Sequence, residues 1–341
     1  MPVGNFAGHA GSGAVSNLAI NGDIYMKKHQ PILSQVILAL TLISLALFLA
    51  GCGSSGSKLP AITGSTGVAY MSHTSSTGTD YQIKLMKTDG TSVTSVGSPD
   101  LYNSAHLSPD GTKILYAILK TGVANQIGIM DVDGSNAKLL LTSGDNEVPQ
   151  FSADGTRVIY QTWGQANDRF DIGLMNVDGT DNTTIDFPLY TSFNPTLSPD
   201  GKTIAFGVNL PSPAVGQGLA TCNADGTGFK LIVSVSGYYV SQPMYTTDGT
   251  KILFSYYNPT TNSGNINSIN PDGSGQIVAL TISNYEATPE AVGSKILFMS
   301  GRSVANPTWD NYQIYSMNPD GSDQTQLTHD TLADTFFAEV E

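Results

Sequence analysis

Short apolar segments alternate with turn signals from about residue 62 to the end of the sequence. In one stretch, Ser104–Leu107 is followed by a Ser-Pro-Asp-Gly turn at 108–111 and by a second apolar segment, Ile114–Leu119. Pro presets φ at the first central position of a turn, and Gly accepts a positive φ. The pattern therefore predicts two antiparallel strands joined by a tight turn. The Ile, Leu and Tyr content of the second segment is typical of buried sheet.

This phrase returns with its Gly at position 155, 201 or 249, and a weaker copy without the Asp lies around Gly293. A second phrase, Ile-Gly-Ile-Met-Asp-Val-Asp-Gly at 127–134, alternates with the first. Six copies of it end at the glycines of positions 90, 134, 179, 226, 273 and 321. A repeat of roughly 40–50 residues that carries several strands indicates a β-propeller.

Six repeats in residues 62–341 leave about 47 residues for each, enough for four short strands per blade. We therefore predict an all-β, six-bladed β-propeller with four antiparallel strands per blade. In the second repeat the predicted strands are Ser104–Leu107, Ile114–Leu119, Gln126–Asp131 and Ala137–Leu141.

The first and last repeats are incomplete in complementary ways. The first opens at Val68-Ala-Tyr70, which matches the second strand of the other repeats, so it lacks an innermost strand. The C-terminal segment Asp334–Glu341 is a surplus strand. We expect this segment to complete blade one, which closes the ring and leaves no sheet edge open.

The N-terminal part is organised differently. Residues 1–25 have no clear apolar period, and we interpret them as a disordered extension or as sequence before the natural start. Residues 26–51 begin with Met-Lys-Lys, continue with an apolar run over 36–50 and end in small residues, the pattern of an export signal. The run is short for a membrane span, which needs about 20 apolar residues. Residues 52–61 predict a flexible tether to the propeller.

Leu49-Ala-Gly-Cys52 resembles the lipobox of bacterial lipoproteins. The resemblance implies that cleavage makes Cys52 the lipidated N-terminus and that the protein is anchored in the cell envelope. In a Gram-negative host it would face the periplasm, with the outer membrane favoured because residue 53 is Gly and not Asp. An uncleaved membrane anchor is the alternative interpretation.

The two repeated phrases together resemble the WD40-like repeats of TolB-type β-propellers, over about residues 62–341. The resemblance implies the propeller fold. TolB carries an α/β domain before its propeller, whereas only a short segment separates Cys52 from Val68. We therefore expect a TolB-like lipoprotein, and the resemblance does not imply membership of the complex in which TolB takes part.

The net charge of -13 disfavours nucleic acid as a partner, because phosphates require Lys and Arg. Much of the acidity belongs to turns. With two Cys and five scattered His, the sequence predicts neither a disulfide framework nor a metal site, and we expect no cofactor. Ten of the 28 acidic residues are the Asp of an Asp-Gly pair, at positions 89, 110, 133, 154, 178, 200, 225, 248, 272 and 320.

Topology separates these turns from the longer loops. If the strands of a blade are A to D from the centre outward, the Asp-Gly turns join A to B and C to D and share one face, the turn face. The irregular B–C and D–A loops share the opposite face, the loop face, where function is expected. It carries the residue types favoured at binding hot spots: Trp163, Arg169, Tyr239, Arg302 and Trp309. The other interpretation is that these side chains pack loops and fill gaps between blades.

Three further candidates, His106, Glu147 and Glu286, fall on predicted innermost strands and are positioned to line the central channel. We expect a monomeric, lipid-anchored, non-catalytic propeller that binds a protein, a peptide or an envelope polysaccharide on its loop face. The alternative is a glycan-active hydrolase or lyase that uses channel carboxylates. Acid–base catalysis of that kind needs two carboxyl groups at a suitable separation, which the sequence does not give.

Overall fold

The computed structural model describes residues 67–73, 81–119, 124–164, 166–211, 216–261, 263–281, 286–303, 312–329 and 334–339. The chain divides into one unit of residues 1–55 and another of residues 56–341, and all described residues belong to the second. The predicted signal segment, Cys52 and Trp309 lie outside the described residues. In the described ranges, no helix is long and apolar enough to cross a membrane.

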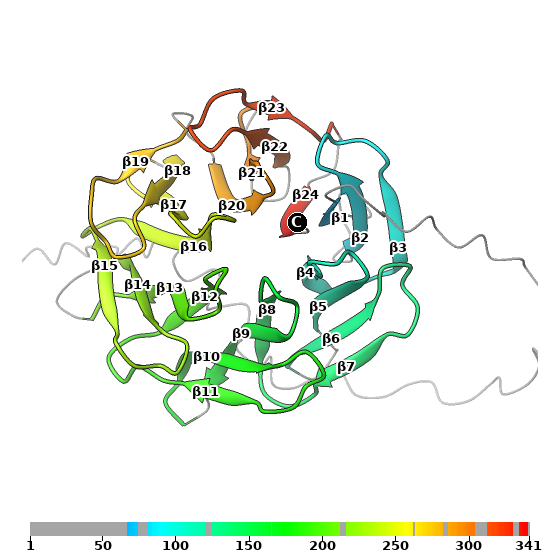
Figure 1. Cartoon of the computed structure of the whole chain (residues 1–341), viewed down its shortest axis with the longest axis horizontal. Coiled ribbons are helices and arrows are strands. Elements are labelled where there is room, and N and C mark those ends of the chain that lie inside the picture. Colours follow the sequence, from blue (N-terminus) through cyan, green and yellow to red (C-terminus); the bar gives the residue numbers. More distant parts are fainter. Residues whose placement is uncertain are drawn as a thin grey trace, which may run out of the picture. The chain divides into compact units, whose positions relative to one another are not determined.

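Six four-stranded antiparallel sheets surround a common centre as the blades of a propeller (Figure 1). The innermost strand of each blade is named first. Blade one is β24 (Asp334–Glu339), β1 (Gly67–His73), β2 (Tyr81–Lys87) and β3 (Thr94–Asp100); blade two is β4 (Tyr102–Leu107), β5 (Lys113–Leu119), β6 (Asn125–Asp131) and β7 (Lys138–Leu141); blade three is β8 (Asn146–Phe151), β9 (Arg157–Gly164), β10 (Arg169–Asn176) and β11 (Thr183–Ile185); blade four is β12 (Ser192–Leu197), β13 (Thr203–Asn209), β14 (Gln217–Asn223) and β15 (Lys230–Ser234); blade five is β16 (Tyr239–Tyr245), β17 (Ile252–Asn258), β18 (Ser263–Ile269) and β19 (Val278–Ala279); blade six is β20 (Glu286–Val292), β21 (Lys295–Ser300), β22 (Gln313–Met317) and β23 (Thr325–Gln326).

The predicted six-bladed propeller and its closure are confirmed. The four strands expected in the second repeat correspond to β4, β5, β6 and β7, with ends that differ by one or two residues. The C-terminal strand β24 pairs antiparallel with β1, from Val68 opposite Glu339 to Ser72 opposite Asp334. Blade one therefore combines the two ends of the repeat region, and β24 lies beside β1 near the centre (Figure 1).

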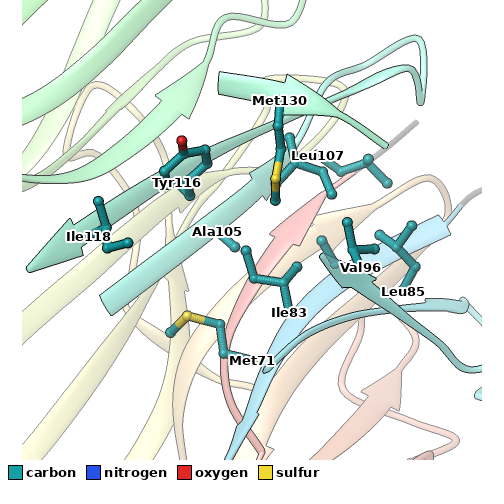
Figure 2. Close-up of a cluster of buried hydrophobic side chains, with 11 residues drawn as sticks. Met71, Ile83, Leu85, Val96, Ala105, Leu107, Tyr116, Ile118 and Met130 are labelled. Carbon is teal, nitrogen blue, oxygen red and sulfur yellow. The ribbon is translucent and has the colours of Figure 1, made fainter. Parts of the chain in front are cut away.

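The hydrophobic core lies between neighbouring blades. Figure 2 shows one such cluster, in which Met71, Ile83 and Val96 of blade one pack against Ala105 and Met130 of blade two. Each blade also has an aromatic residue in the middle of its second strand, and all six are buried. These aromatic residues are Tyr70, Tyr116, Tyr160, Phe206, Phe254 and Phe298. Tyr116 and Tyr160 each lie over a glycine of the neighbouring strand and leave no room for a side chain there. A Cβ on Gly128 would lie 2.3 Å from Tyr116 Cζ, and a Cβ on Gly173 would lie 2.1 Å from Tyr160 Cζ.

A register shift interrupts the innermost strand of every blade. In blades three to six the shift is an X-Pro pair that lies opposite a single aromatic residue, which is a β-bulge. Because Pro has no N–H, the bulge leaves one donor fewer to satisfy. The residues before these prolines all have positive φ: Val148 (51°), Asn194 (48°), Gln242 (55°) and Thr288 (47°).

Two of these bulges are bonded to the preceding blade. The Asn194 N–H donates to Gln161 Oε1 of blade three at 3.0 Å. The Thr288 N–H donates to Gln242 Oε1 and to the Ser255 hydroxyl of blade five, at 3.0 and 3.1 Å. A bulge takes its N–H out of the regular ladder, and a buried N–H needs another acceptor. The neighbouring blade supplies that acceptor, so the bulges join blades as well as bend strands.

All ten Asp-Gly turns lie on the turn face, as expected from the topology. Asp248 is representative: its Oδ1 accepts from the Thr246 hydroxyl at 2.7 Å and from the Thr250 N–H at 3.0 Å. Hydrogen bonds from neighbouring Ser and Thr residues lower the pKa of all ten carboxyl groups from their usual value of 3.8. The turn face is therefore anionic down to acid pH.

We expect the turn carboxylates to make the propeller sensitive to acid. Because folding lowers their pKa, their stabilisation is present above the unfolded pKa of about 3.9 and is lost as the pH falls through the folded pKa. Asp248→Asn keeps an oxygen acceptor in the turn but cannot titrate. Urea unfolding should show that this variant loses less stability than the native chain between pH 5 and pH 3. An unchanged pH slope would contradict the assignment.

We also expect closure by β24 to be essential for stability. Deletion of residues 334–341 leaves β1 with an unpaired edge and removes one side of blade one. The truncated chain should melt at least about 10 °C below the full chain, since several kcal/mol are lost. Deletion of residues 340 and 341 alone is the control and should change little. Calorimetry checks both, and equal melting temperatures for all three chains would disprove the expectation.

Candidate binding site on the loop face

Trp163 and Phe170 form an aromatic pair at the loop-face end of blade three. They are directly opposite each other on β9 and β10, and their rings meet edge to face with centroids 4.9 Å apart. Both residues are half-buried. Edge-to-face pairs of this kind add stability beyond simple burial, so the pair is a fixed part of the surface.

Arg169, the first residue of β10, fixes the loop that follows β11. Its Nη2 forms an ion pair with Asp186 Oδ1 at 2.6 Å, and its Nη1 donates to the Pro188 carbonyl at 3.1 Å. The Arg169 side chain is only 19% exposed, so the guanidinium acts mainly within the protein. Arg169 thus lies at the loop-face end of blade three and holds another loop in place.

That loop presents an exposed hydrophobic tip. Phe187, Pro188, Leu189 and Tyr190 form a β-turn that is closed by a hydrogen bond from the Tyr190 N–H to the Phe187 carbonyl at 2.8 Å. Pro188 stands at the first central position, which its fixed φ favours. Leu189 is 73% exposed, the highest value of any large hydrophobic residue in the described ranges.

Aromatic contacts hold both ends of this turn against blade four. Phe187 stacks on Phe206 with ring centroids 5.2 Å apart, and Tyr190 stacks on Phe229 at 4.8 Å. With Arg169 on one side and these rings on the other, the turn has little freedom to move. Leu189 is therefore exposed from a turn that is held in place by its neighbours.

Asp171 lies beneath Arg169 and is almost fully buried. Burial raises the pKa of its carboxyl group, and the nearby Asp186 acts in the same direction, whereas a hydrogen bond from Asn167 opposes the shift. Asn167 Nδ2 donates to Asp171 Oδ2 at 2.9 Å, and Arg169 Nε lies 3.7 Å from Asp171 Oδ1. Two carboxyl groups thus share one guanidinium, which fixes Arg169 more firmly than a single ion pair would.

The loop-face candidates of blades five and six are also held by neighbours. Tyr239 stacks on Tyr257 with ring centroids 6.1 Å apart. The Arg302 guanidinium lies over the rings of Phe298 and Tyr315, at 5.3 and 4.9 Å from their centroids. Both contacts fit the interpretation that these residues pack the ends of the blades.

Arg302 also forms an ion pair with Glu286, whose side chain is completely buried, and its Nη1 donates to Gln324 Oε1 at 2.5 Å. Glu147 is buried between blades two and three, where it accepts from Asn125 Nδ2 at 2.5 Å and from Gln161 Nε2 at 2.9 Å. Both carboxylates are therefore engaged with side chains of the propeller itself.

His106 lies at the other end of the propeller. It lines a cavity of about 80 Å³ on the turn-face side of the channel, together with residues from four other innermost strands. Burial lowers the pKa of His106 to about 3, so the imidazole is neutral at neutral pH. The residues from these four strands include Gln150, Thr196, Met244 and Glu290.

The structure thus joins some of the predicted residues and separates others. Trp163 and Arg169 share the end of blade three, Arg302 is bonded to Glu286, and His106 belongs to the turn-face side. Sequence reasoning missed Leu189, although the Pro188 before it was a turn signal. Within the described ranges, no three His, Cys, Asp or Glu side chains come together to hold a metal ion.

No family model and no curated protein matches the sequence. Solved structures do resemble the fold. TolB from Acinetobacter baumannii matches with a TM-score of 0.67 and 17% identity over 81% of this chain and 67% of that chain. A putative TolB from Agrobacterium tumefaciens matches with a TM-score of 0.60 and 18% identity over 81% and 91%. An oligogalacturonate lyase from Vibrio parahaemolyticus matches with a TM-score of 0.51 and 12% identity over 72% of this chain and 70% of that chain. The expected TolB-like propeller fold is confirmed.

We expect Arg302→Ala to destabilise the propeller, because it leaves the buried Glu286 carboxylate without its cation. Removal of one partner of a buried ion pair costs about 3–5 kcal/mol. Replacement of Glu286 by Gln in the same variant removes the uncompensated charge and should restore part of the loss. Urea unfolding at pH 7 measures both. A loss below about 1 kcal/mol for Arg302→Ala would show that the pair acts as an exposed salt bridge.

Proposed function

We propose that this TolB-like propeller is a non-catalytic binding scaffold that captures a protein or peptide on its loop face, with Leu189 and Trp163 at the centre of the contact. The observation that carries the proposal is the β-turn at 187–190, which presents a 73% exposed leucine from an ordered loop. An apolar group held in its binding position loses little conformational entropy when a partner covers it.

The surroundings of Leu189 suit a protein partner. Trp163 on β9 and Phe170 on β10 form one region, and the turn that follows β11 forms the other. Arg169, the first residue of β10, connects the two regions through its bonds to Asp186 and Pro188. Tryptophan is enriched at binding hot spots, and Arg169 contributes by holding the turn in place. The negative net charge of the chain further favours protein over nucleic acid.

Binding is preferred over glycan turnover because the two carboxylates considered for acid–base work have other partners. Glu147 is bonded to Asn125 and Gln161, and Glu286 to Arg302. A general acid or base must be free to reach the substrate. These contacts support a structural role for both residues.

We further propose that the protein is exported and anchored in the bacterial envelope through a lipid on Cys52. The support is the basic start at Met26, the apolar run over 36–50 and the Leu-Ala-Gly-Cys sequence that ends at Cys52. Residues 52–61 would then form a flexible tether between the lipid and the propeller.

The test is site-specific photo-crosslinking in cells that express the full chain. A benzoylphenylalanine at position 189 should give a discrete product with one protein, whereas the same group at position 277, which is exposed on the outer part of blade five, should not. Once the partner is identified, Leu189→Asp should weaken its affinity roughly 30-fold or more, as expected of a hot-spot residue.

Ile277→Asp is the matched control, because it places the same charge at another exposed apolar position. Equal crosslinking at positions 189 and 277, or an unchanged affinity of the Leu189→Asp variant, would overturn the proposed site. A polysaccharide turned over by the full chain, with activity lost in Glu147→Gln or Glu286→Gln, would overturn the non-catalytic assignment.

A further inference from the structure

A second candidate site lies on the turn face, between blades two and three. The cleft has a volume of about 430 Å³, within the range of ligand sites. Four turns surround it: the A–B and C–D turns of both blades. Its apolar lining comes from Pro109, Ile129, Met130, Phe151 and Val177.

The neighbouring boundary between blades three and four shows how such a space is filled. There Arg157, the first residue of β9, reaches across and donates from Nη2 to the Gly201 carbonyl at 2.7 Å. The equivalent residue of blade two is Lys113, which forms an ion pair with Asp131 of its own blade. Lys113 therefore does not bridge to blade three.

The residue that faces this position on the third strand also differs between the blades. It is Asp131, the last residue of β6, in blade two, whereas blades three to six have Asn at the equivalent position, at the end of the third strand or directly after it: Asn176, Asn223, Asn270 and Asn318. Lysines at the equivalent position of blades five and six also bond within their own blade, Lys251 to Asn270 and Lys295 to Asn318, whereas Arg157 bridges to the next blade. Asp131 is fixed in turn by Asn136, whose Nδ2 donates to Asp131 Oδ2 at 2.6 Å.

The edge of the cleft is anionic. It carries Asp110, Asp154 and Asp178 against one ammonium group, Lys138, because Lys113 is neutralised by Asp131. In each of the three aspartates the turn hydrogen bonds go to Oδ1. The second oxygen, Oδ2, has no hydrogen bond within the described ranges and is available to a ligand.

We propose that this cleft binds an arginine side chain of a basic peptide segment from a partner protein. The methylene stem would pack on Met130 and Pro109, because long cationic side chains cover apolar surface while their charge stays near water. The guanidinium would meet the edge carboxylates, whose planar geometry it matches, and the ring of Phe151. This site is independent of the loop-face contact proposed above.

The test measures binding of a labelled peptide to the full chain by fluorescence anisotropy. The probe is Gly-Leu-Arg-Phe-Arg-Gly, and the comparison peptides carry Glu or citrulline in place of both arginines. We expect the arginine peptide to bind at least about tenfold more tightly than either, and its affinity to fall as salt rises. Equal affinity for the three peptides, or no binding of the arginine peptide, would overturn the proposal.

Two sets of variants locate the site. The double variant Lys113→Arg/Asp131→Asn reproduces the Arg157 and Asn176 pair of blade three, so the new arginine should bridge to the Gly155 carbonyl and fill the cleft. The double variant should no longer bind the peptide. Lys295→Arg in blade six, where Lys295 is bonded to Asn318, is the control and should bind the peptide with native affinity.

Asp154→Asn/Asp178→Asn is a second variant that keeps the oxygen acceptor in each turn and removes only charge. This variant should bind the arginine peptide with an affinity at least about fivefold lower than that of the native chain. Leu189→Asp should not affect this peptide, which separates the cleft from the loop-face site. Native affinity in both the cleft-filling and the charge-removing variants would disprove the assignment.

Discussion

The pairing of β24 with β1 is the constraint on which the rest of the structure depends. The hydrophobic clusters lie between adjacent blades, so each blade is stable only when both of its neighbours are present. A linear row of six blades would leave two faces uncovered and one sheet incomplete. The ring removes both problems at once, because the C-terminal strand becomes the innermost strand of the first blade.

The repeated part of this architecture was predictable from the sequence. Turn residues such as Pro109, Asp110 and Gly111 act locally, and the apolar strands follow at a fixed distance, so strand order and ring closure could be read directly. The bulges were missed, although the prolines at 149, 195 and 243 each precede the turn Gly by six residues. Their effect depends on a side chain in the preceding blade, as with Gln161 and Asn194, which sequence spacing does not show.

The site was less predictable because its residues act through non-local partners. The sequence identified Arg169 and Trp163 by residue type and placed them on the correct face. It did not show that Arg169 is bonded to Asp186, 17 residues away, or that this contact positions Leu189. Likewise, the sequence placed Glu286 on an innermost strand but did not show that Arg302 pairs with it. Loop conformation decided each case, and no repeated pattern governs these loops.

The bonded bulges also define what can be exchanged between blades. The acceptor for the Asn194 N–H belongs to blade three, and the acceptors for the Thr288 N–H belong to blade five. A blade that was duplicated or lost as a single sheet would separate such a donor from its acceptor. A segment that begins just before one bulge and ends after the next carries donor and acceptors together, because Gln242 is itself a bulge residue of blade five. At these boundaries, the unit of inheritance is therefore one blade from its bulge onward, together with the innermost strand of the next blade as far as its own bulge.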